Sequence, residues 1–130
     1  MKIIRCLDQK GNSVYASQQP DGSALKITGD IFGSFITTTE KVEVKKLLAP
    51  VQPTSIICIG LNYRKHAEET GAKFPEVPVV FFKGINTLQN PGDAIEIPTH
   101  MRSDEVDYEC ELAVVIGRAC KNVSRQNALD

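Results

Sequence analysis

Two glutamates, Glu109 and Glu111, interrupt the apolar stretch VDYECELAVVIG at residues 106–117. The stretch predicts a β-strand, and because side chains alternate between the faces of a strand, both carboxylates project from one side, ~7 Å apart. A half-buried pair of like charges at this distance repels itself and loses hydration unless a cation lies between the two groups. The pair therefore indicates a site for a hard divalent cation. The spacing alone leaves open an exposed sheet edge with two solvated glutamates.

His66 and Glu69 form a second pair with chemical potential, three residues apart in a polar stretch. This stretch predicts a short helix that Asn62 caps and Gly71 ends. Residues three apart share a helix face, so the carboxylate can hydrogen-bond one imidazole nitrogen and leave the other facing water or a substrate. The pattern is typical of a general base with its orienting partner, and Glu68, on another face, is the weaker partner. The alternative is a solvated helix whose histidine has no chemical role.

Lys83 ends the stretch VVFFK at residues 79–83, which predicts another strand. Val79, Phe81 and Lys83 share one face of that strand, so an ammonium group stands at the end of an apolar stripe. Such a lysine is able to bind a substrate carboxylate. The alternative is a lysine that simply extends into solvent at the end of a strand.

The elements that position these residues begin with a β-rich N-terminal part. Short apolar runs bounded by turn residues predict strands at residues 3–7, 14–17 and 25–28. Residues 30–43 show no clear period, and an apolar run follows before Pro50 and Pro53. We therefore predict a small β-rich N-terminal segment at residues 1–50 and a second unit at residues 51–130.

The second unit contains the candidate site. The β-branched run TSIICI at residues 54–59 predicts a buried strand. The sequence NPGD at residues 90–93 is a strong turn signal, and a loop then leads into the stretch with the two glutamates. Residues 124–130 predict the opening of a helix with Ser124 as its cap.

Composition limits the class of protein. The chain has 130 residues, 42% hydrophobic and 24% charged, with a net charge of −1, which is typical of a globular domain. No basic run interleaves with aromatic residues, so we expect no nucleic-acid binding. Neither a membrane-spanning stretch of ~18 apolar residues nor a signal peptide is recognisable, so we expect a cytoplasmic protein without membrane association. The four cysteines form no C-x-x-C pair and predict small core residues rather than zinc ligands.

Four motifs follow one another in the chain: IICIGLNYRKHAEE, VVFFKG, NPGDAIEIP and VDYECELAVVIGRACKNVS. In this order and spacing they resemble the fumarylacetoacetate hydrolase family, and the resemblance covers residues 50–130. It implies an α+β, predominantly β fold: a mixed β-sheet roll of the family type, incomplete here and preceded by the small β-rich N-terminal segment. It also implies a homodimer that binds Mg²⁺ or Mn²⁺ and acts on small 2-oxo or β-diketo acids.

The resemblance also implies a role for each candidate residue. The metal ligands are Glu109 and Glu111, the catalytic dyad is His66 and Glu69, and the substrate-binding residues are Lys83, Asn62 and Tyr63. The third metal ligand of the family is an aspartate that we expect downstream of the glutamates, outside this chain. Asp107 shares a strand face with Glu109, but its reach and register differ from those of the missing aspartate.

The function implied is divalent-metal-dependent hydrolysis of a C–C bond in a substrate of the acylpyruvate or fumarylacetoacetate type. In this reaction the metal stabilises an enolate and the His-Glu dyad activates water. An isomerase, decarboxylase or lyase of the same family is the alternative enzyme. A non-catalytic truncated homologue or assembly partner is the alternative outside the enzymes. Because a metal carboxylate is expected elsewhere, we expect the 130-residue chain alone to be catalytically silent.

Overall fold

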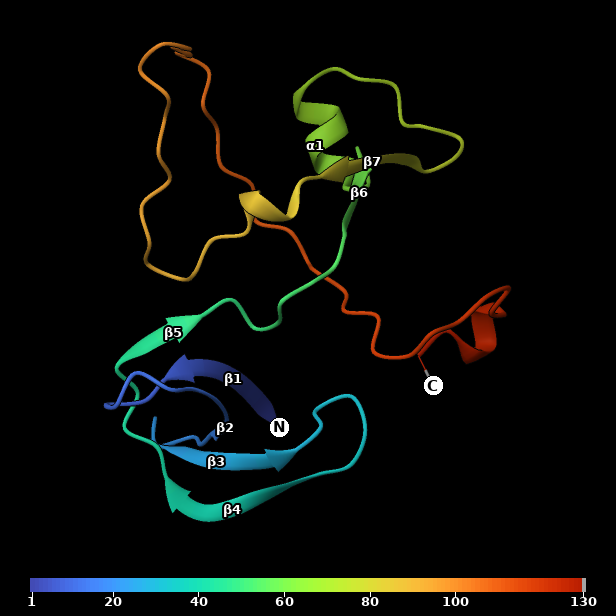
Figure 1. Ribbon diagram of the computed structural model, residues 1–130. Coiled ribbons are helices and arrows are strands. Elements are labelled where there is room, and N and C mark those ends of the chain that lie inside the picture. The colour runs from blue at the N-terminus through green and yellow to red at the C-terminus, as the bar shows by residue number, and fades with distance from the viewer. Residues whose placement is uncertain (130) are drawn as a thin grey trace.

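The computed structural model describes residues 1–129. Within them the chain is predominantly β, with seven strands, one α-helix and two short 3₁₀ helices (Figure 1). The strands form one sheet of five strands and one sheet of two strands. The expectation of a β-rich chain is therefore confirmed. Every strand pair in this part of the chain is antiparallel, so the expected mixture of parallel and antiparallel strands is not found there.

The five-stranded sheet contains the three strands predicted for the first thirty residues and runs in the order β4-β3-β2-β1-β5. Its strands are β1 (Lys2–Leu7), β2 (Ser13–Gln18), β3 (Ala24–Gly29), β4 (Phe35–Lys41) and β5 (Lys46–Leu48). Gly11 and Gly22, in the turns predicted between the first strands, each have φ +84°. Glycine adopts this left-handed conformation without a steric penalty, so these turns form where the sequence predicts them.

Strand β4 is an element that the sequence pattern does not predict. Its sequence, FITTTEK, carries threonines on both faces and is mostly exposed, so no hydrophobic alternation marks it. The strand nevertheless pairs with β3, with a register shift between Leu25 and Ile27. The Thr38 hydroxyl donates to the Lys26 carbonyl at 3.0 Å near this irregularity. Backbone pairing rather than side-chain burial therefore defines this strand.

The buried core is small and lies mainly in the N-terminal sheet. Its apolar members are Cys6, Ala16, Ala24 and Ile27 in the strands of this sheet, and Ala49 and Ala67 outside them. Cys6 is completely buried, and burial raises the pKa of its thiol. Cys110 and Cys120 are exposed, so the expectation that the cysteines are core residues is correct for Cys6 and wrong for these two.

The second sheet pairs β6 (Ile56–Gly60) with β7 (Val79–Lys83), and helix α1 (Arg64–Glu69) lies in the connection between the two strands. Both strands lie where the sequence predicts them. The division between the two sheets falls between β5 and β6, close to residue 50. The separation into domains at that residue stays a prediction.

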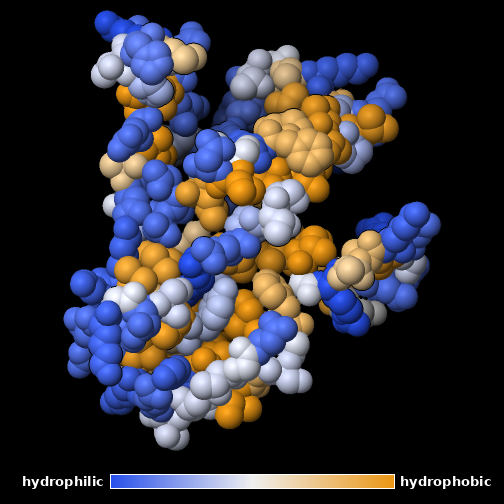
Figure 2. All heavy atoms as spheres, viewed as in Figure 1, coloured by the Kyte–Doolittle hydropathy of each residue, from blue (hydrophilic) through white to orange (hydrophobic). Residues whose placement is uncertain are grey.

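The burial expected for residues 54–59 is not found in the second sheet. β6 is only partly covered and every residue of β7 is exposed, because two strands alone offer each other no covering layer. Apolar side chains accordingly gather on the surface around α1 and β7 (Figure 2). Phe82 of β7, for example, is 71% exposed.

Residues 106–117, predicted as one long strand, pair with no other strand within residues 1–129. They run as an irregular chain from the level of the second sheet toward the C-terminal end (Figure 1, orange to red). The strand prediction is therefore wrong. Hydrogen bonds to a neighbouring strand stabilise a strand, and an alternating sequence does not supply those bonds. The apolar side chains of this stretch are exposed, Leu112 at 82%.

Two 3₁₀ helices complete the described elements: η1 (Ile85–Thr87) and η2 (Arg125–Asn127). Ser124 is the N-cap of η2, although its side chain makes no capping bond. This turn lies where the sequence predicts a helix opening at residues 124–130, of which Asp130 lies outside the described residues. None of the helices in residues 1–129 has the length and apolar character needed to span a bilayer.

The predicted turn at residues 90–93 attaches the second part of the chain to the N-terminal sheet. Asn90 Oδ1 accepts the backbone N–H of Ala49 at 3.0 Å, and its Nδ2 donates to Asp93 at 2.9 Å. Asp93 also accepts a hydrogen bond from Lys46 of β5 at 2.8 Å. The bonds from Lys46 and Asn90 lower the pKa of the Asp93 carboxyl. We call these four residues the junction clamp.

We expect the junction clamp to stabilise the folded protein at neutral pH and to lose this effect in acid. Since the pKa of Asp93 is lower in the folded protein than in the unfolded chain, its charge stabilises the fold above the unfolded value of ~3.9. This stabilisation is lost as the pH falls through the folded pKa. We expect Asp93→Asn to lower the urea midpoint of unfolding at neutral pH and to match the wild type near pH 2.

The control is Asp104→Asn, which removes a carboxylate from an exposed pair with Arg102. Exposed pairs contribute little, so this variant should resemble the wild type at both pH values. An effect of Asp93→Asn that is equally large at both pH values would contradict the assignment to its charge.

Candidate functional site

One pocket, of about 500 Å³, brings together three segments that lie far apart in the sequence. These are the turn and helix after β6, one face of β7, and residues 107–111, which we call the acidic segment. All seven residues predicted for the site line this pocket: Asn62, Tyr63, His66, Glu69, Lys83, Glu109 and Glu111. The other lining residues are Gly60, Leu61, Phe81, Asp107, Tyr108 and Cys110.

A tight turn after β6 carries the first group of these residues. Leu61 has φ +51°, a left-handed conformation that is uncommon for residues other than glycine. The Asn62 side chain supports this turn, since its Nδ2 donates to the Ile59 carbonyl at 2.8 Å. Helix α1 then begins at Arg64, with Tyr63 at the N-cap position. The prediction that Asn62 caps the helix is therefore wrong, because its amide holds the turn that precedes the helix.

The other end of α1 follows the prediction that Gly71 terminates it. Thr70 is the C-cap, and Gly71 has φ +65°. Ala72 N–H donates to the Ala67 carbonyl at 2.9 Å, and Gly71 N–H donates to the Glu68 carbonyl at 3.1 Å. This pair of bonds is a Schellman motif, which satisfies carbonyls that a helix end leaves unpaired. The motif ends the helix after Glu69, so the helix that carries His66 extends no further along the chain.

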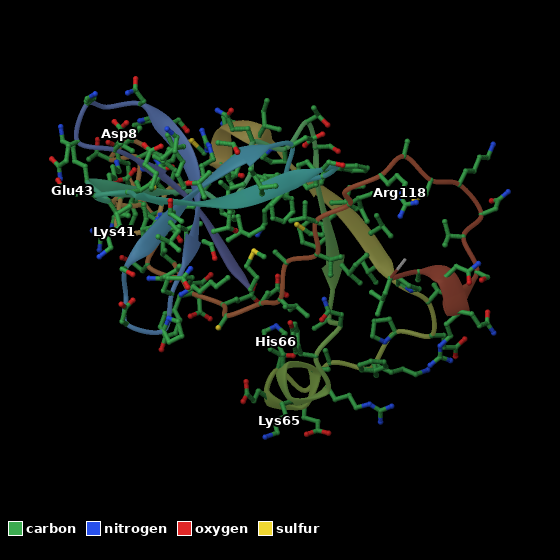
Figure 3. All side chains as sticks on the ribbon, turned by 90° about the horizontal axis from the view of Figure 1, so that it is seen from below. Asp8, Lys41, Glu43, Lys65, His66 and Arg118 are labelled. Carbon is green, nitrogen blue, oxygen red and sulfur yellow. The ribbon has the colours of Figure 1, made fainter. Side chains whose placement is uncertain are left out.

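His66 faces the acidic segment. Its Nε2 lies 3.6 Å from Oε1 of Glu109, and the two side chains are 43% and 53% exposed. This distance exceeds a hydrogen bond and the pair is open to water, so the attraction is weak even when the imidazole is protonated. In Figure 3, His66 and Lys65 leave opposite sides of α1. Within residues 1–129 it is Glu109, not Glu69, that pairs with His66, and the role of Glu69 stays a prediction.

The acidic segment places three carboxylates on the pocket, those of Asp107, Glu109 and Glu111. Tyr108 and Cys110, which lie between them, line the pocket as well. Residues 107–111 are assigned to no strand in the described part of the chain, so the predicted alternation of faces does not apply to them. Glu109 and Glu111 both line the pocket although the predicted strand is not formed, and their convergence on one cation stays a prediction.

Side-chain contacts hold the residues that follow the acidic segment. The Tyr63 hydroxyl oxygen accepts the backbone N–H of Leu112 at 2.8 Å. Further along, Gly117 lies against the ring of Phe32, in the turn between β3 and β4, so closely that a Cβ at residue 117 would come within 3.0 Å of the ring. The segment is therefore attached both to the turn before α1 and to the N-terminal sheet.

The register of the second sheet sets the length of the pocket. Gly60, where the turn begins, lies opposite Val79, whereas Ile56 lies opposite Lys83. These two ends are separated by four residues of strand, or ~13 Å. Phe81 lies between them on the face of Lys83, as the alternation of VVFFK predicts, and both residues line the pocket. The pocket therefore extends along β7 from the turn before α1 to the ammonium group.

The pocket carries more negative than positive charge. Glu69 and the three carboxylates of the acidic segment line it together with one ammonium group, that of Lys83. Such an excess attracts cations, and carboxylate oxygens are the ligands that hard divalent cations prefer. In the described part of the chain, no three His, Cys, Asp or Glu side chains lie close enough together to hold a metal ion. Glu109 and Glu111 offer carboxylate oxygens, and their predicted role as metal ligands stays a prediction.

The sequence pattern does not identify every residue of the pocket. Leu61 has no signal, because a leucine in a left-handed conformation is not expected from its type. Phe81 can be identified from the sequence, because it shares a strand face with Lys83. Asp107 is considered from the sequence but is not predicted to be a metal ligand. Nothing in the pattern predicts that Tyr108 lines the pocket.

Comparison with known proteins agrees with the motifs. The family profile described as fumarylacetoacetate (FAA) hydrolase C-terminal matches residues 55–130. The solved structure of an uncharacterised protein from Mycobacterium abscessus is similar, with a TM-score of 0.60 and 29% identity, over 76% of this chain and 39% of that chain.

Curated relatives extend the same result. The chain is 51% identical over 88 residues to a fumarylacetoacetate hydrolase domain-containing protein 2 homolog from Dictyostelium discoideum, covering 68% of this chain and 28% of the relative. It is 39% identical to oxaloacetate tautomerase YisK from Bacillus subtilis, over 98% of this chain and 42% of the relative. It is 36% identical to caffeoylpyruvate hydrolase from Neonothopanus nambi, over 84% of this chain and 38% of the relative. The chain thus spans less than half the length of each relative.

The C-terminal cap of α1, which ends the helix that carries His66, can be tested by mutation. Gly71→Ala places a Cβ on a left-handed residue with no other atom within 4 Å, so backbone strain is the main cost. We expect the free energy of unfolding, measured with urea, to fall by about 1–2 kcal/mol. Gly71→Asn is the matched control and should lose less, because asparagine tolerates this conformation better. Equal losses in both variants would show that the left-handed cap is not the cause.

Proposed function

The chain belongs to the fumarylacetoacetate hydrolase family, and from this membership we propose that it forms part of a divalent-metal-dependent hydrolase. The proposed substrates are small 2-oxo or β-diketo acids of the acylpyruvate or fumarylacetoacetate type, in which the enzyme breaks a C–C bond. The observation that carries the proposal is the convergence of all seven predicted residues on one pocket. The volume of that pocket, about 500 Å³, suits a small organic ligand.

Lys83 would hold the acid group of the substrate. It is the one ammonium group that lines the pocket among the described residues, and a carboxylate is its natural partner. Because Lys83 lies at one end of the pocket and the turn leading to His66 at the other, a substrate held by its carboxylate would extend along Phe81. Its reacting carbonyl would then approach His66. The oxygen of the Asn62 amide and the hydroxyl of Tyr63 are the remaining polar groups at that end.

His66 would act as the general base. It would take a proton from water as the resulting hydroxide adds to the carbonyl carbon distant from the carboxylate. The C–C bond then breaks, and its electron pair leaves on the 2-oxo acid fragment as an enolate, which receives a proton at carbon from His66. The products are a carboxylic acid and a 2-oxo acid, so atoms and protons balance. A carboxylate near the imidazole, Glu109 in this structure or Glu69 as predicted, would stabilise its protonated form.

The residues proposed to hold Mg²⁺ or Mn²⁺ are Glu109 and Glu111. When bound, such an ion supplies a Lewis acid that withdraws electron density from the substrate oxygens. The support for this proposal is the excess of carboxylates around the pocket, which otherwise repel one another and an anionic substrate.

A tautomerase of oxaloacetate is the second candidate function, because the relative that matches 98% of this chain bears that name. In that reaction His66 would remove a proton from one atom of the substrate and return it to another, with no water consumed. Decarboxylase and lyase reactions would use the same base. A non-catalytic chain is the alternative outside the enzymes.

The family's mixed β-sheet roll, the homodimer and the cytoplasmic location belong to the proposal as well. They rest on the resemblance and on the composition of the chain, as does the absence of nucleic-acid and membrane partners. The exposed apolar side chains around β7 suit a structure in which further β-strands or a second subunit cover this sheet.

The role of His66 is tested by His66→Ala in the full-length protein. We expect turnover of an acylpyruvate to fall by ~10²–10⁴-fold, the usual contribution of a general base, while Mg²⁺ affinity stays nearly unchanged because imidazole is not a proposed ligand. Hydrolysis is followed spectrophotometrically, and the enol-to-keto conversion of oxaloacetate is measured in parallel.

The matched control is His100→Ala, which removes the other histidine of the chain, exposed and outside the pocket. It should behave like the wild type. A His66→Ala variant that keeps most of its kcat would contradict the role of His66. A wild-type protein that acts on neither substrate would instead favour the non-catalytic alternative.

The proposed metal ligands are tested by Glu109→Gln and Glu111→Gln. Each change replaces a charged oxygen ligand with a neutral amide, and loss of a direct ligand should cost at least the ~10–100-fold that loss of an outer-shell partner costs. Calorimetric titration of Mg²⁺ measures the affinity. Glu105→Gln, an exposed carboxylate outside the pocket, should bind Mg²⁺ as the wild type does. Unchanged affinity in both site variants would remove Glu109 and Glu111 from the metal site.

A further inference from the structure

Within residues 1–129 the acidic segment lies in no sheet, yet its residues share one pocket with His66. Among the hydrogen bonds of the described residues, a single one joins residues 106–117 to another part of the fold. It is the bond in which the Tyr63 hydroxyl oxygen accepts the backbone N–H of Leu112 at 2.8 Å. Leu112 directly follows Glu111, so this bond acts at the end of the acidic segment.

The position of Tyr63 makes this bond a link between the proposed base and the proposed carboxylates. Tyr63 is the N-cap of α1, and His66 follows three residues later in the same helix. On the other side, Glu109 precedes Leu112 by three residues and approaches His66 at 3.6 Å. Both contacts are open to water, but the Tyr63 bond has the length of a good hydrogen bond, whereas the His66 pair at 3.6 Å is longer than one. The Tyr63 bond is therefore the stronger of the two contacts between these pieces of chain.

We propose that Tyr63 is a positioning residue whose hydroxyl holds the acidic segment at its working distance from His66. The inference rests on the proposed function and deepens it, because it identifies a contact that joins the acidic segment to the helix of the proposed base. A phenol hydroxyl has one proton to donate and two acceptor sites. The Leu112 amide occupies one acceptor site, so the proton stays available to a substrate oxygen. The predicted contact of Tyr63 with substrate is thus compatible with its positioning role.

The test compares Tyr63→Phe with Tyr15→Phe in the full-length protein. The first change removes only the oxygen that accepts the Leu112 N–H. The second removes the hydroxyl of a tyrosine in β2 that does not line the pocket. The measured quantities are the amide exchange rate of Leu112 by nuclear magnetic resonance, the Mg²⁺ affinity by calorimetry, and kcat and KM for an acylpyruvate. Thermal unfolding checks that both variants are folded.

We expect Tyr63→Phe to accelerate exchange at Leu112 and to weaken Mg²⁺ binding, each by roughly fivefold to tenfold, as the loss of one hydrogen bond implies. The value of kcat should fall by a similar factor while KM changes little, because the carboxylates are misplaced while the Lys83 end of the pocket is intact. Tyr15→Phe should leave all of these quantities as in the wild type.

Three results would overturn the positioning role. Unchanged exchange at Leu112 in Tyr63→Phe would show that the bond does not hold the segment. Faster exchange with Mg²⁺ affinity and kcat equal to those of Tyr15→Phe would show that the bond does not position the site. A rise in KM with unchanged kcat would make Tyr63 a substrate contact only. If the wild type lacks turnover, the proposed function fails, and the exchange rate and Mg²⁺ affinity still decide whether Tyr63 positions the segment.

Discussion

The antiparallel pairing of β6 with β7 is the constraint on which the site depends. Its register places Gly60 opposite Val79 and Ile56 opposite Lys83, so the turn into α1 and the ammonium group occupy opposite ends of one short sheet. A shift of the register by one residue would move the whole face of β7 away from the pocket, because side chains alternate along a strand. Backbone hydrogen bonds, rather than any side chain of the pocket, therefore set the length of the site and its direction.

The carboxylate side of the pocket depends on a different kind of interaction. Residues 106–117 have no partner strand within residues 1–129, and side chains attach them: Tyr63 at Leu112 and Phe32 at Gly117. The N-terminal sheet contributes to this arrangement through Phe32 and also through the junction clamp at residues 90–93. The N-terminal part of the chain therefore contacts two later segments, the turn at residues 90–93 and the chain at Gly117. It also contains the larger part of the buried core.

Exposure decides which forces operate in this pocket. Both members of the His66 and Glu109 pair are about half exposed, so water screens their attraction and the geometry between them is weakly held. The excess of carboxylates acts differently, since several like charges around one volume raise the attraction for a cation even without deep burial. The attraction of such a site for a cation depends on the number and placement of its charges. The contacts that position the acidic segment are therefore important.

The sequence by itself determined the local features of this protein: the strands β1, β2, β3, β6 and β7, the turns at Gly11 and Gly22, and the end of α1 at Gly71. Each depends on neighbours within a few positions, where alternation and backbone conformation are encoded directly. Only the tertiary structure decided the rest. β4 forms without a hydrophobic pattern because β3 pairs with it, and residues 106–117 are irregular despite a strong pattern because no described strand pairs with them. The Asn62 amide serves a turn instead of a cap, and Glu109 rather than Glu69 lies beside His66, because contacts between segments distant in the chain depend on how those segments pack.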